Sequence, residues 1–315
     1  MIKDIALAGA GTMGTSMALI FAEKGYHVTV VYRHEATGIK SKEQIYTALE
    51  TKIAEGQLDQ KDKDAILKKL TYTKDLGSFA ACDLVVESIA EDLTIKSVYW
   101  KQISDLARED AILATNTSGL SITKLATAVS HPERFVGMHW FNPPHLIPLI
   151  EVIKGEKTSE ATAKQVYDLS LSLGKKPIMV HKDAKGFIAN RLQLAVLREA
   201  IHIVENGIGS FKDVDDCMKY GLGFRYACLG PFEVTDLGGL DVFHNVAKYL
   251  YADLSADQQP QPLFNKLVAE SKLGVKSQEG FYDYHKGKDK EAIKNRDAKF
   301  MAQSKLLASF EKGND

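Results

Sequence analysis

The sequence has few features that would tie it to metals, disulfides, nucleic acids or membranes. It contains only three cysteines, Cys82, Cys217 and Cys228, without CxxC or His-rich spacing, which argues against a disulfide framework and a zinc site. Its 40 basic and 41 acidic residues give a formal net charge of −1, so charge does not favour nucleic acid or an anionic membrane as a partner. No apolar run approaches the roughly 18 residues of a membrane span. These absences favour small-molecule partners and predict no metal.

We also expect no targeting signal at the N-terminus. An apolar strand and a glycine turn follow the first residue directly, which leaves no room for a charged region, an apolar region and a cleavage site. With 315 residues, of which 45% are hydrophobic and 26% charged, the chain is long enough for two domains. We expect a soluble cytoplasmic protein with reduced thiols.

What the sequence does contain is an alternation of strand-like and helix-like segments. Segments of helical spacing separate apolar or β-branched runs at residues 2–8, 28–31, 84–86, 111–114 and 135–138. This alternation predicts an α/β domain, with a parallel sheet covered by helices on both faces. Residues 41–70 have the pattern of two polar amphipathic helices and form an insertion longer than a simple crossover needs.

The pattern changes after residue 184. Residues 187–205 have the spacing of one long helix, and no later segment resembles a buried strand. We therefore predict a Rossmann-like dinucleotide-binding domain with a helical insertion over residues 1–184, and an all-helical C-terminal domain over residues 185–315.

A glycine motif near the N-terminus predicts the cofactor class. Gly9, Gly11 and Gly14 form GxGxxG between a strand and a helix, inside a unit of about 30 residues. The first glycine permits the turn, the second admits the pyrophosphate, and the third lets helix and strand pack closely. The helix that begins with Thr12 and Met13 offers free N–H groups and its positive dipole end to the phosphates. The motif therefore predicts binding of NAD or NADP.

The end of the second strand departs from the usual NAD pattern. An Asp or Glu at this position normally accepts a hydrogen bond from the ribose 2′-hydroxyl. Here Tyr32 takes its place, followed by Arg33, whose guanidinium suits a 2′-phosphate, and by His34 as a helper. In the alternative, Arg33 points to solvent and Glu35 replaces the acid. We favour NADPH over NADH.

A histidine and a glutamate suit the acid–base chemistry of hydride transfer. His139, in "RFVGMHWFNPP", is at the C-terminal end of a strand, where ligands of open α/β sheets bind. Glu151 interrupts the otherwise apolar strand of "LIPLIEVIKG", an unfavourable location for an unpaired carboxylate. A histidine tuned by a carboxylate suits catalysis at neutral pH. Alone, His139 is more typical of a hydrogen-bonded core histidine, but beside the cofactor motif we predict that it pairs with Glu151.

Eight motifs in one order make the chain similar to the L-3-hydroxyacyl-CoA dehydrogenase family over nearly its full length. They are "GAGTMG", "VVESIAEDLTIK", "NTSGLSIT", "RFVGMHWFNPP", "LIEVIKG", "KGFIANRL", "GPFEVTDLGGLD" and "GFYDY". The resemblance implies an enzyme of fatty acid metabolism that forms a homodimer through its helical domain. It also implies that His139 is the general base and that Glu151 orients it.

The same resemblance implies roles for four further residues. Ser118 and Asn190 would hydrogen-bond the substrate hydroxyl or carbonyl, and Glu91 and Lys96 would lie by the nicotinamide half of the cofactor. In the structural alternative, Ser118 and Asn190 cap or bridge helices.

Three functions remain open from the sequence. The first is the interconversion of a short-chain (3S)-3-hydroxyacyl-CoA with its 3-oxo form, with Lys52, Lys68 and Lys69 near the CoA phosphates. The second is the same chemistry on a free 3-hydroxy acid, because "FNPPHLIPLIEV" and "GLGFRYACLGP" look more like the branch of L-gulonate 3-dehydrogenase, lambda-crystallin and carnitine dehydrogenase. Arg225 would then bind the substrate carboxylate; a domain-interface salt bridge is its alternative role. The third is a non-catalytic dinucleotide-binding sensor or structural protein.

Overall fold

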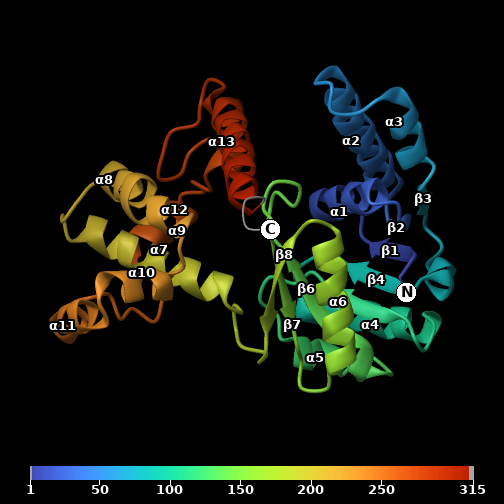
Figure 1. The fold of residues 1–315 in the computed structure, drawn as a ribbon, viewed down its shortest axis with the longest axis horizontal. Helices are drawn as coiled ribbons and strands as arrows, with labels where there is room; N and C mark the ends of the chain where they lie inside the picture. The colour runs from blue at the N-terminus through green and yellow to red at the C-terminus, as the bar shows by residue number, and fades with distance from the viewer. Residues whose placement is uncertain (1, 312–315) are drawn as a thin grey trace. The chain divides into compact units, whose positions relative to one another are not determined.

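The computed structural model describes residues 2–311 and is shown in Figure 1. The chain divides into two compact units, Met1–Arg191 and Leu192–Asp315. Each unit has its own secondary-structure class, so each is described by itself.

The first unit is built on one eight-stranded sheet with the order β3-β2-β1-β4-β5-β6-β7-β8. Its strands are β1 (Asp4–Ala8), β2 (His27–Val31), β3 (Leu70–Thr73), β4 (Leu84–Glu87), β5 (Ile112–Thr115), β6 (Phe135–Trp140), β7 (Leu149–Ile153) and β8 (Lys176–Val180). The first six strands are parallel, so their carboxyl ends meet at one edge of the sheet. We call this the carboxyl edge.

Two apolar cores cover the two faces of the sheet. Alternate residues of β1 point to opposite faces, with Ile5 and Leu7 in one core and Ala6 and Ala8 in the other. The first core is closed by α1 (Thr12–Glu23), α2 (Glu35–Ala54), α3 (Gln60–Leu67) and α6 (Glu160–Ser172). The second is closed by α4 (Leu93–Leu106), α5 (Ile122–Ala126) and the 3₁₀ helix Leu76–Ala81. A short 3₁₀ helix, Pro132–Arg134, leads into β6. The predicted α/β class is confirmed.

The sheet differs from the prediction in three strands: β7 runs antiparallel, and neither β3 nor β8 was expected. β7 is antiparallel to β6, because residues 141–148 are too few for the helical crossover that a parallel pair requires. β3 was not expected, since its four residues follow directly on the predicted helical insertion. The insertion itself is two helices, as predicted, but α2 begins earlier, at Glu35.

The second unit is all-helical in its described part. It contains the end of α7 (Ala189–Glu205) and then α8 (Phe211–Cys217), a π-helical turn (Met218–Leu222), α9 (Gly223–Tyr226), α10 (Pro231–Gly238), α11 (Leu240–Leu250), α12 (Pro262–Ala269), a 3₁₀ turn (Val275–Ser277) and α13 (Lys288–Glu311). Its only β-type pairings among residues 192–311 are isolated bridges. The predicted helical class is confirmed. Within residues 2–311, no helix combines the length and the apolar character that crossing a bilayer requires.

Candidate active site

The turn between β1 and α1 has the shape of a dinucleotide cradle. Gly9 has a φ of +120°, and a Cβ there would lie 2.4 Å from the Ser88 carbonyl oxygen. A Cβ on Gly14 would lie 2.0 Å from the Gly9 carbonyl oxygen. Around Gly11, by contrast, a Cβ would meet nothing within 4 Å. Gly9 and Gly14 are therefore required by packing, whereas Gly11 presents open backbone.

The start of α1 adds hydrogen-bond donors to this cradle. Gly11 is the N-cap residue of α1, and no side chain caps the helix. The amides of the first turn, which begins with Thr12 and Met13, therefore have no side-chain acceptor, and the positive end of the helix dipole lies beside the open face of Gly11. These residues fit the pyrophosphate of a dinucleotide.

Charged side chains surround the carboxyl end of β2. The Tyr32 hydroxyl donates to the Glu35 carboxylate over 3.2 Å, and Lys74, which follows β3, pairs with the same carboxylate at 2.6 Å. The hydrogen bond from Lys74 is the main cause that lowers the pKa of Glu35. Arg33 and His34 are exposed, and their side chains have no polar partner within residues 2–311. The acid nearest to this strand end is thus already paired, while the Arg33 guanidinium is not.

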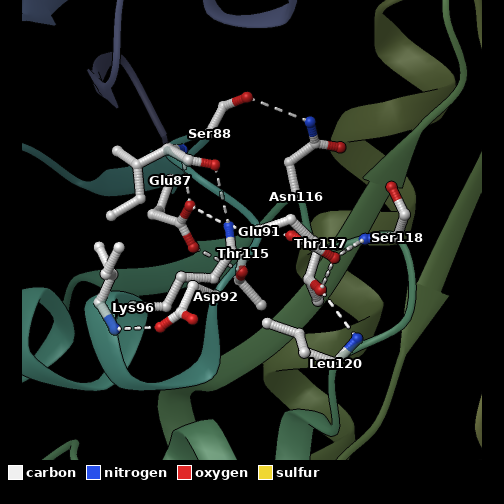
Figure 2. A network of polar contacts seen from close by, with 12 residues as sticks. Glu87, Ser88, Glu91, Asp92, Lys96, Thr115, Asn116, Thr117, Ser118 and Leu120 are labelled. Carbon is white, nitrogen blue, oxygen red and sulfur yellow. Dashed lines mark hydrogen bonds and ion pairs between the residues drawn. The ribbon is translucent and has the colours of Figure 1, made fainter. Parts of the chain in front are cut away.

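β4 and β5 end in a buried polar network, shown in Figure 2. Glu87, the last residue of β4, is fully buried and accepts hydrogen bonds from the Lys96 ammonium, the Ile89 amide at 2.8 Å and the Thr115 hydroxyl at 2.7 Å. Lys96, on the first turns of α4, is only 1% exposed and also faces Glu91 at 3.3 Å. One buried lysine therefore lies between two carboxylates.

Glu91 connects this network to the predicted substrate-binding residues. One of its carboxylate oxygens accepts hydrogen bonds from the Thr117 hydroxyl at 2.5 Å and the Ser118 amide at 2.8 Å (Figure 2). The Asn190 side-chain amide donates to the Ser118 carbonyl over 2.7 Å. Both backbone groups of Ser118 are held, and its exposed hydroxyl has no partner in the described chain.

His139 and Glu151 are directly opposite each other on β6 and β7. The distance from His139 Nδ1 to Glu151 Oε2 is 2.8 Å, and the two residues are 4% and 0% exposed. The other oxygen of Glu151 accepts hydrogen bonds from the amides of Ile188 and Ala189, each at 2.9 Å, where α7 begins. The antiparallel turn of the chain after β6 is what brings this pair together.

These contacts fix the charge state of Glu151. Burial would raise its pKa, but the hydrogen bonds from His139, Ala189 and Ile188 outweigh burial and hold the pKa below its ordinary value. An ionised carboxylate accepts a hydrogen bond from Nδ1–H, so the lone pair of the imidazole is on Nε2. Among residues 2–311, Nε2 has no hydrogen-bond partner. The pair therefore presents a hydrogen-bond acceptor at Nε2.

Backbone strain and aromatic packing hold the histidine in place. Gly186 and Phe187, just before α7, have φ angles of +75° and +52°, a conformation that a phenylalanine rarely adopts. This turn aims the two amides at Glu151 and buries the Phe187 ring 5.8 Å from the His139 ring. The Phe141 ring lies on another side at 4.4 Å. The imidazole therefore has little freedom to rotate.

The structure links four of the predicted site residues. Asn190 contacts Ser118 and directly follows Ala189, which contacts Glu151, the partner of His139. All four belong to the first unit.

The four basic residues predicted near the substrate carboxylate or the CoA phosphates have different surroundings. Arg225 is exposed on α9 in the second unit and makes no ion pair within residues 2–311. Lys52 pairs with Glu23 on α1. Lys69 contacts His27 at 3.0 Å, at the end of β2 opposite to the carboxyl edge. Lys68 is the C-cap residue of α3.

Several polar residues of the site were not anticipated from the sequence. The buried Asn116 accepts from the Trp140 amide at 2.8 Å and donates to the Ser88 hydroxyl at 3.3 Å, so it bridges the ends of β4, β5 and β6. Glu87 and Thr115 were missed in the same way. The available signal was a polar residue directly after an apolar run, as in "LVVE" and "ILATNT".

Two parts of one known family match the sequence. Residues 4–184 match "3-hydroxyacyl-CoA dehydrogenase, NAD binding domain", and residues 186–284 match "3-hydroxyacyl-CoA dehydrogenase, C-terminal domain". Together these regions span most of the chain.

Individual relatives carry two kinds of name. The chain is 39% identical over 294 residues to the human mitochondrial hydroxyacyl-coenzyme A dehydrogenase, covering 90% of this chain and 92% of the relative. It is 38% identical over 312 residues to 5-formyl-3-hydroxy-2-methylpyridine 4-carboxylate 5-dehydrogenase of Mesorhizobium japonicum, covering 99% of this chain and 100% of the relative.

A solved structure of the second kind is similar in three dimensions. It is a crystal structure of a 5-formyl-3-hydroxy-2-methylpyridine 4-carboxylic acid 5-dehydrogenase, described as an NAD⁺-dependent dismutase. The TM-score is 0.90 at 38% identity, covering 98% of this chain and 99% of that one. Fold, matched regions and relatives agree: the chain belongs to the 3-hydroxyacyl-CoA dehydrogenase family and is an NAD-dependent oxidoreductase that acts on CH–OH groups.

Proposed function

We propose that this enzyme interconverts a short-chain (3S)-3-hydroxyacyl-CoA and its 3-oxo form, with His139 and Glu151 as the acid–base pair. The observation that carries the proposal is the buried His139–Glu151 hydrogen bond, with Nε2 left open, in a chain of this family. An acyl-CoA substrate would place the enzyme in fatty acid metabolism.

The residues of the site have separate parts in this reaction. When bound, the nicotinamide cofactor accepts or supplies the hydride; the glycine cradle and the first turn of α1 would hold its pyrophosphate. In the oxidation direction, His139 Nε2 takes the proton of the 3-hydroxyl group as the hydride leaves C3. The ionised Glu151 stabilises the resulting imidazolium, and the proton returns to the 3-oxo oxygen in reduction. Ser118 and Asn190 would orient that oxygen.

The test is the initial rate of acetoacetyl-CoA reduction by the purified protein, with NADH and NADPH at equal concentration. The proposal predicts turnover of ordinary enzymatic size, roughly 1–10³ per second. Binding of a cofactor without reduction of acetoacetyl-CoA or of any free 3-oxo acid would contradict it and favour a sensor or structural role.

A free 3-hydroxy acid is the second candidate substrate. The observation that favours it is the match, over 99% of this chain, to a relative whose name specifies a pyridine carboxylate instead of a thioester. Pairing of Lys52 with Glu23 and the remote position of Lys69 also leave fewer cations for CoA phosphates. In this case we propose that Arg225, exposed and unpaired in the described chain, binds the substrate carboxylate.

A substitution separates the two substrates. If the substrate is a free acid, Arg225→Met should raise its KM about tenfold to a hundredfold, the loss of a charge-assisted hydrogen bond, with little change in kcat. Arg296→Met, on α13, is the matched control. An unchanged KM for the free acid would exclude a contact between Arg225 and the substrate carboxylate. Turnover of acetoacetyl-CoA but of no free acid would exclude free 3-hydroxy acids as the substrate class.

We also propose NADPH as the preferred cofactor. The support is the Arg33 side chain at the end of β2, which has no partner among the described residues. His34 follows Arg33 in the sequence, and Lys74 follows the neighbouring strand β3. An acid at this strand end would otherwise accept a hydrogen bond from the ribose 2′-hydroxyl. The comparison of the two cofactors in the rate assay tests it. A larger kcat/KM with NADH would contradict the proposal and assign the acid's role to Glu35.

We further propose separate roles for the two parts of the chain. Residues 1–184 would bind the dinucleotide, and residues 185–315 would contribute to substrate binding and form a homodimer. Exposed large apolar residues on α10 and α11, such as Phe232, Leu237 and Leu240, support a second copy as partner. Light scattering should give twice the 34.8 kDa of the chain; a monomer at micromolar concentration would refute the dimer.

A further inference from the structure

We propose that Glu87, through Lys96, sets the electrostatic balance of the nicotinamide end of the site and so its preference for oxidised over reduced cofactor. Glu87 is a positioning residue in this proposal, since it reaches the cofactor only through Lys96 and Glu91. The inference rests on the proposed dinucleotide binding described above.

The network of Glu87, Lys96 and Glu91 lies on the β4 and β5 side of the carboxyl edge. The cradle and the end of β2 are one half of the carboxyl edge, and β4 and β5 are the next strands on the other side of β1. A dinucleotide lies across the two halves of such an edge, so its nicotinamide half belongs over β4 and β5. Glu91 lies in the loop between β4 and α4 and keeps 43% of its side chain exposed.

The two other charged groups of the network are buried. Glu87 and Lys96 are 0% and 1% exposed, and Figure 2 shows them in one network with Glu91. Lys96 is therefore not free to reach a ligand in solvent. It donates to Glu87 and, over a longer 3.3 Å, faces Glu91. The ammonium faces Oε2 of Glu91, while Oε1 accepts from the Thr117 hydroxyl and the Ser118 amide.

The charges of the three groups do not cancel. Two carboxylates and one ammonium leave one net negative charge, and Glu91 is the exposed member of the three. The oxidised nicotinamide ring carries a positive charge, whereas the reduced ring is neutral. A negative charge beside the ring stabilises the oxidised form selectively, and the effect is strengthened by the low dielectric of a buried network. Burial, with a smaller contribution from the Glu87 carboxylate, raises the pKa of Tyr99 on α4 to about 12.

Neutralising Glu87 therefore has a specific consequence. In Glu87→Gln the Lys96 charge is no longer balanced within the buried pair, so it turns to Glu91 and the three groups sum to zero. Oxidised cofactor should bind more weakly, while reduced cofactor is almost unaffected. We expect the ratio of the dissociation constants, oxidised over reduced, to rise about tenfold, the effect of one charge at roughly 8–10 Å in a medium of intermediate dielectric.

The experiment measures binding of the oxidised and reduced forms of the preferred cofactor to wild type and three variants. Reduced cofactor is followed by its fluorescence, and oxidised cofactor by calorimetry. Glu87→Gln should raise the ratio about tenfold. The double variant Glu87→Gln/Lys96→Met removes both buried charges and keeps that of Glu91, so its ratio should return to within about twofold of wild type. Thr115→Val, which removes a hydrogen bond to Glu87 but no charge, is the matched control and should leave the ratio unchanged.

The outcomes separate the two proposals. If wild type binds neither form, the proposed dinucleotide binding fails. If wild type binds both forms and Glu87→Gln weakens them equally, Glu87 has only a structural role and the inference is overturned. If Glu87→Gln does not fold, Lys96→Met is measured in addition: with the ammonium removed and both carboxylates kept, the ratio should fall about tenfold, and a ratio within twofold of wild type contradicts the inference.

Discussion

The two halves of the carboxyl edge are built differently. At the carboxyl ends of β4 to β6, and at Glu151 on the neighbouring β7, buried charged groups have fixed partners: Glu87 with Lys96, Glu151 with His139 and two amides. At the ends of β2 and β3, the charged groups Arg33, His34, Glu35 and Lys74 are exposed. An exposed ion pair contributes about 0–1 kcal/mol, whereas breaking a buried one costs several. The buried half is therefore fixed for one chemistry, and the exposed half can change the cofactor it selects without disturbing the fold.

The largest effect should come from the base of the buried half. His139→Gln removes the proton acceptor but keeps a side chain that can hydrogen-bond Glu151. We expect kcat to fall by about 10²–10⁴, with the dissociation constant of the cofactor unchanged within about twofold. Steady-state kinetics and a fluorescence titration measure the two quantities. His131→Gln, at an exposed site, is the control. A kcat near that of wild type would show that another group moves the proton.

Next in size should be the loss of the orienting carboxylate. Glu151→Gln keeps the shape but cannot stabilise an imidazolium, so kcat should fall by about 10². Glu156→Gln, an exposed residue that follows β7, serves as the control. If Glu151→Gln lost as little as the control, the 2.8 Å contact would be structural only.

The exposed half should change selectivity rather than rate. Arg33→Gln removes the unpaired guanidinium, and we expect kcat/KM for NADPH relative to NADH to fall about tenfold, the equivalent of a charge-assisted hydrogen bond. The value of kcat with saturating NADH should stay the same. Arg296→Gln controls for the loss of a surface charge. An unchanged ratio would show that Arg33 points to solvent.

The buried carboxylate should also make stability depend on pH. The folded-state pKa of Glu151 is below its unfolded value, so this group stabilises the fold above about pH 4.3 and loses that contribution as the pH falls through the folded pKa. Urea unfolding should give a gap between wild type and Glu151→Gln that narrows, on the order of 1 kcal/mol, from pH 5 to pH 3. A gap that widens in acid would mean that Glu151 is protonated in the folded state.

The smallest effect should come from the exposed pair of Glu35 and Lys74. Glu35→Gln frees the Lys74 ammonium next to the end of β2, so the preference for NADPH should rise about twofold to fivefold, as for a surface ion pair. Glu55→Gln, at the exposed C-cap of α2, is the control. A fall in the preference would show that Glu35 orients Arg33 instead of competing with it.

The difference between the halves also explains what the sequence could predict. The glycine cradle was predictable because close packing leaves one solution at Gly9 and Gly14, and the His139–Glu151 pair because a carboxylate in an apolar strand needs a partner. The antiparallel direction of β7 was missed because the apolar pattern of a strand is the same in either direction; the short connection of residues 141–148 was the available signal. Glu87 and Asn116 were missed because a polar residue at a strand end is typical of the surface. Their burial follows only from the neighbouring elements.

One set of variants tests most directly the claim that the buried half performs the chemistry and the exposed half selects the cofactor. It compares His139→Gln, Arg33→Gln and the double variant in both cofactors, using whichever substrate class wild type turns over. We predict that His139→Gln lowers kcat by at least 10² and leaves the NADPH to NADH ratio of binding constants within twofold of wild type. Arg33→Gln should change that ratio about tenfold and leave kcat unchanged. The two effects should add in the double variant. A His139→Gln enzyme with wild-type kcat, or with a tenfold change in that ratio, would contradict the account.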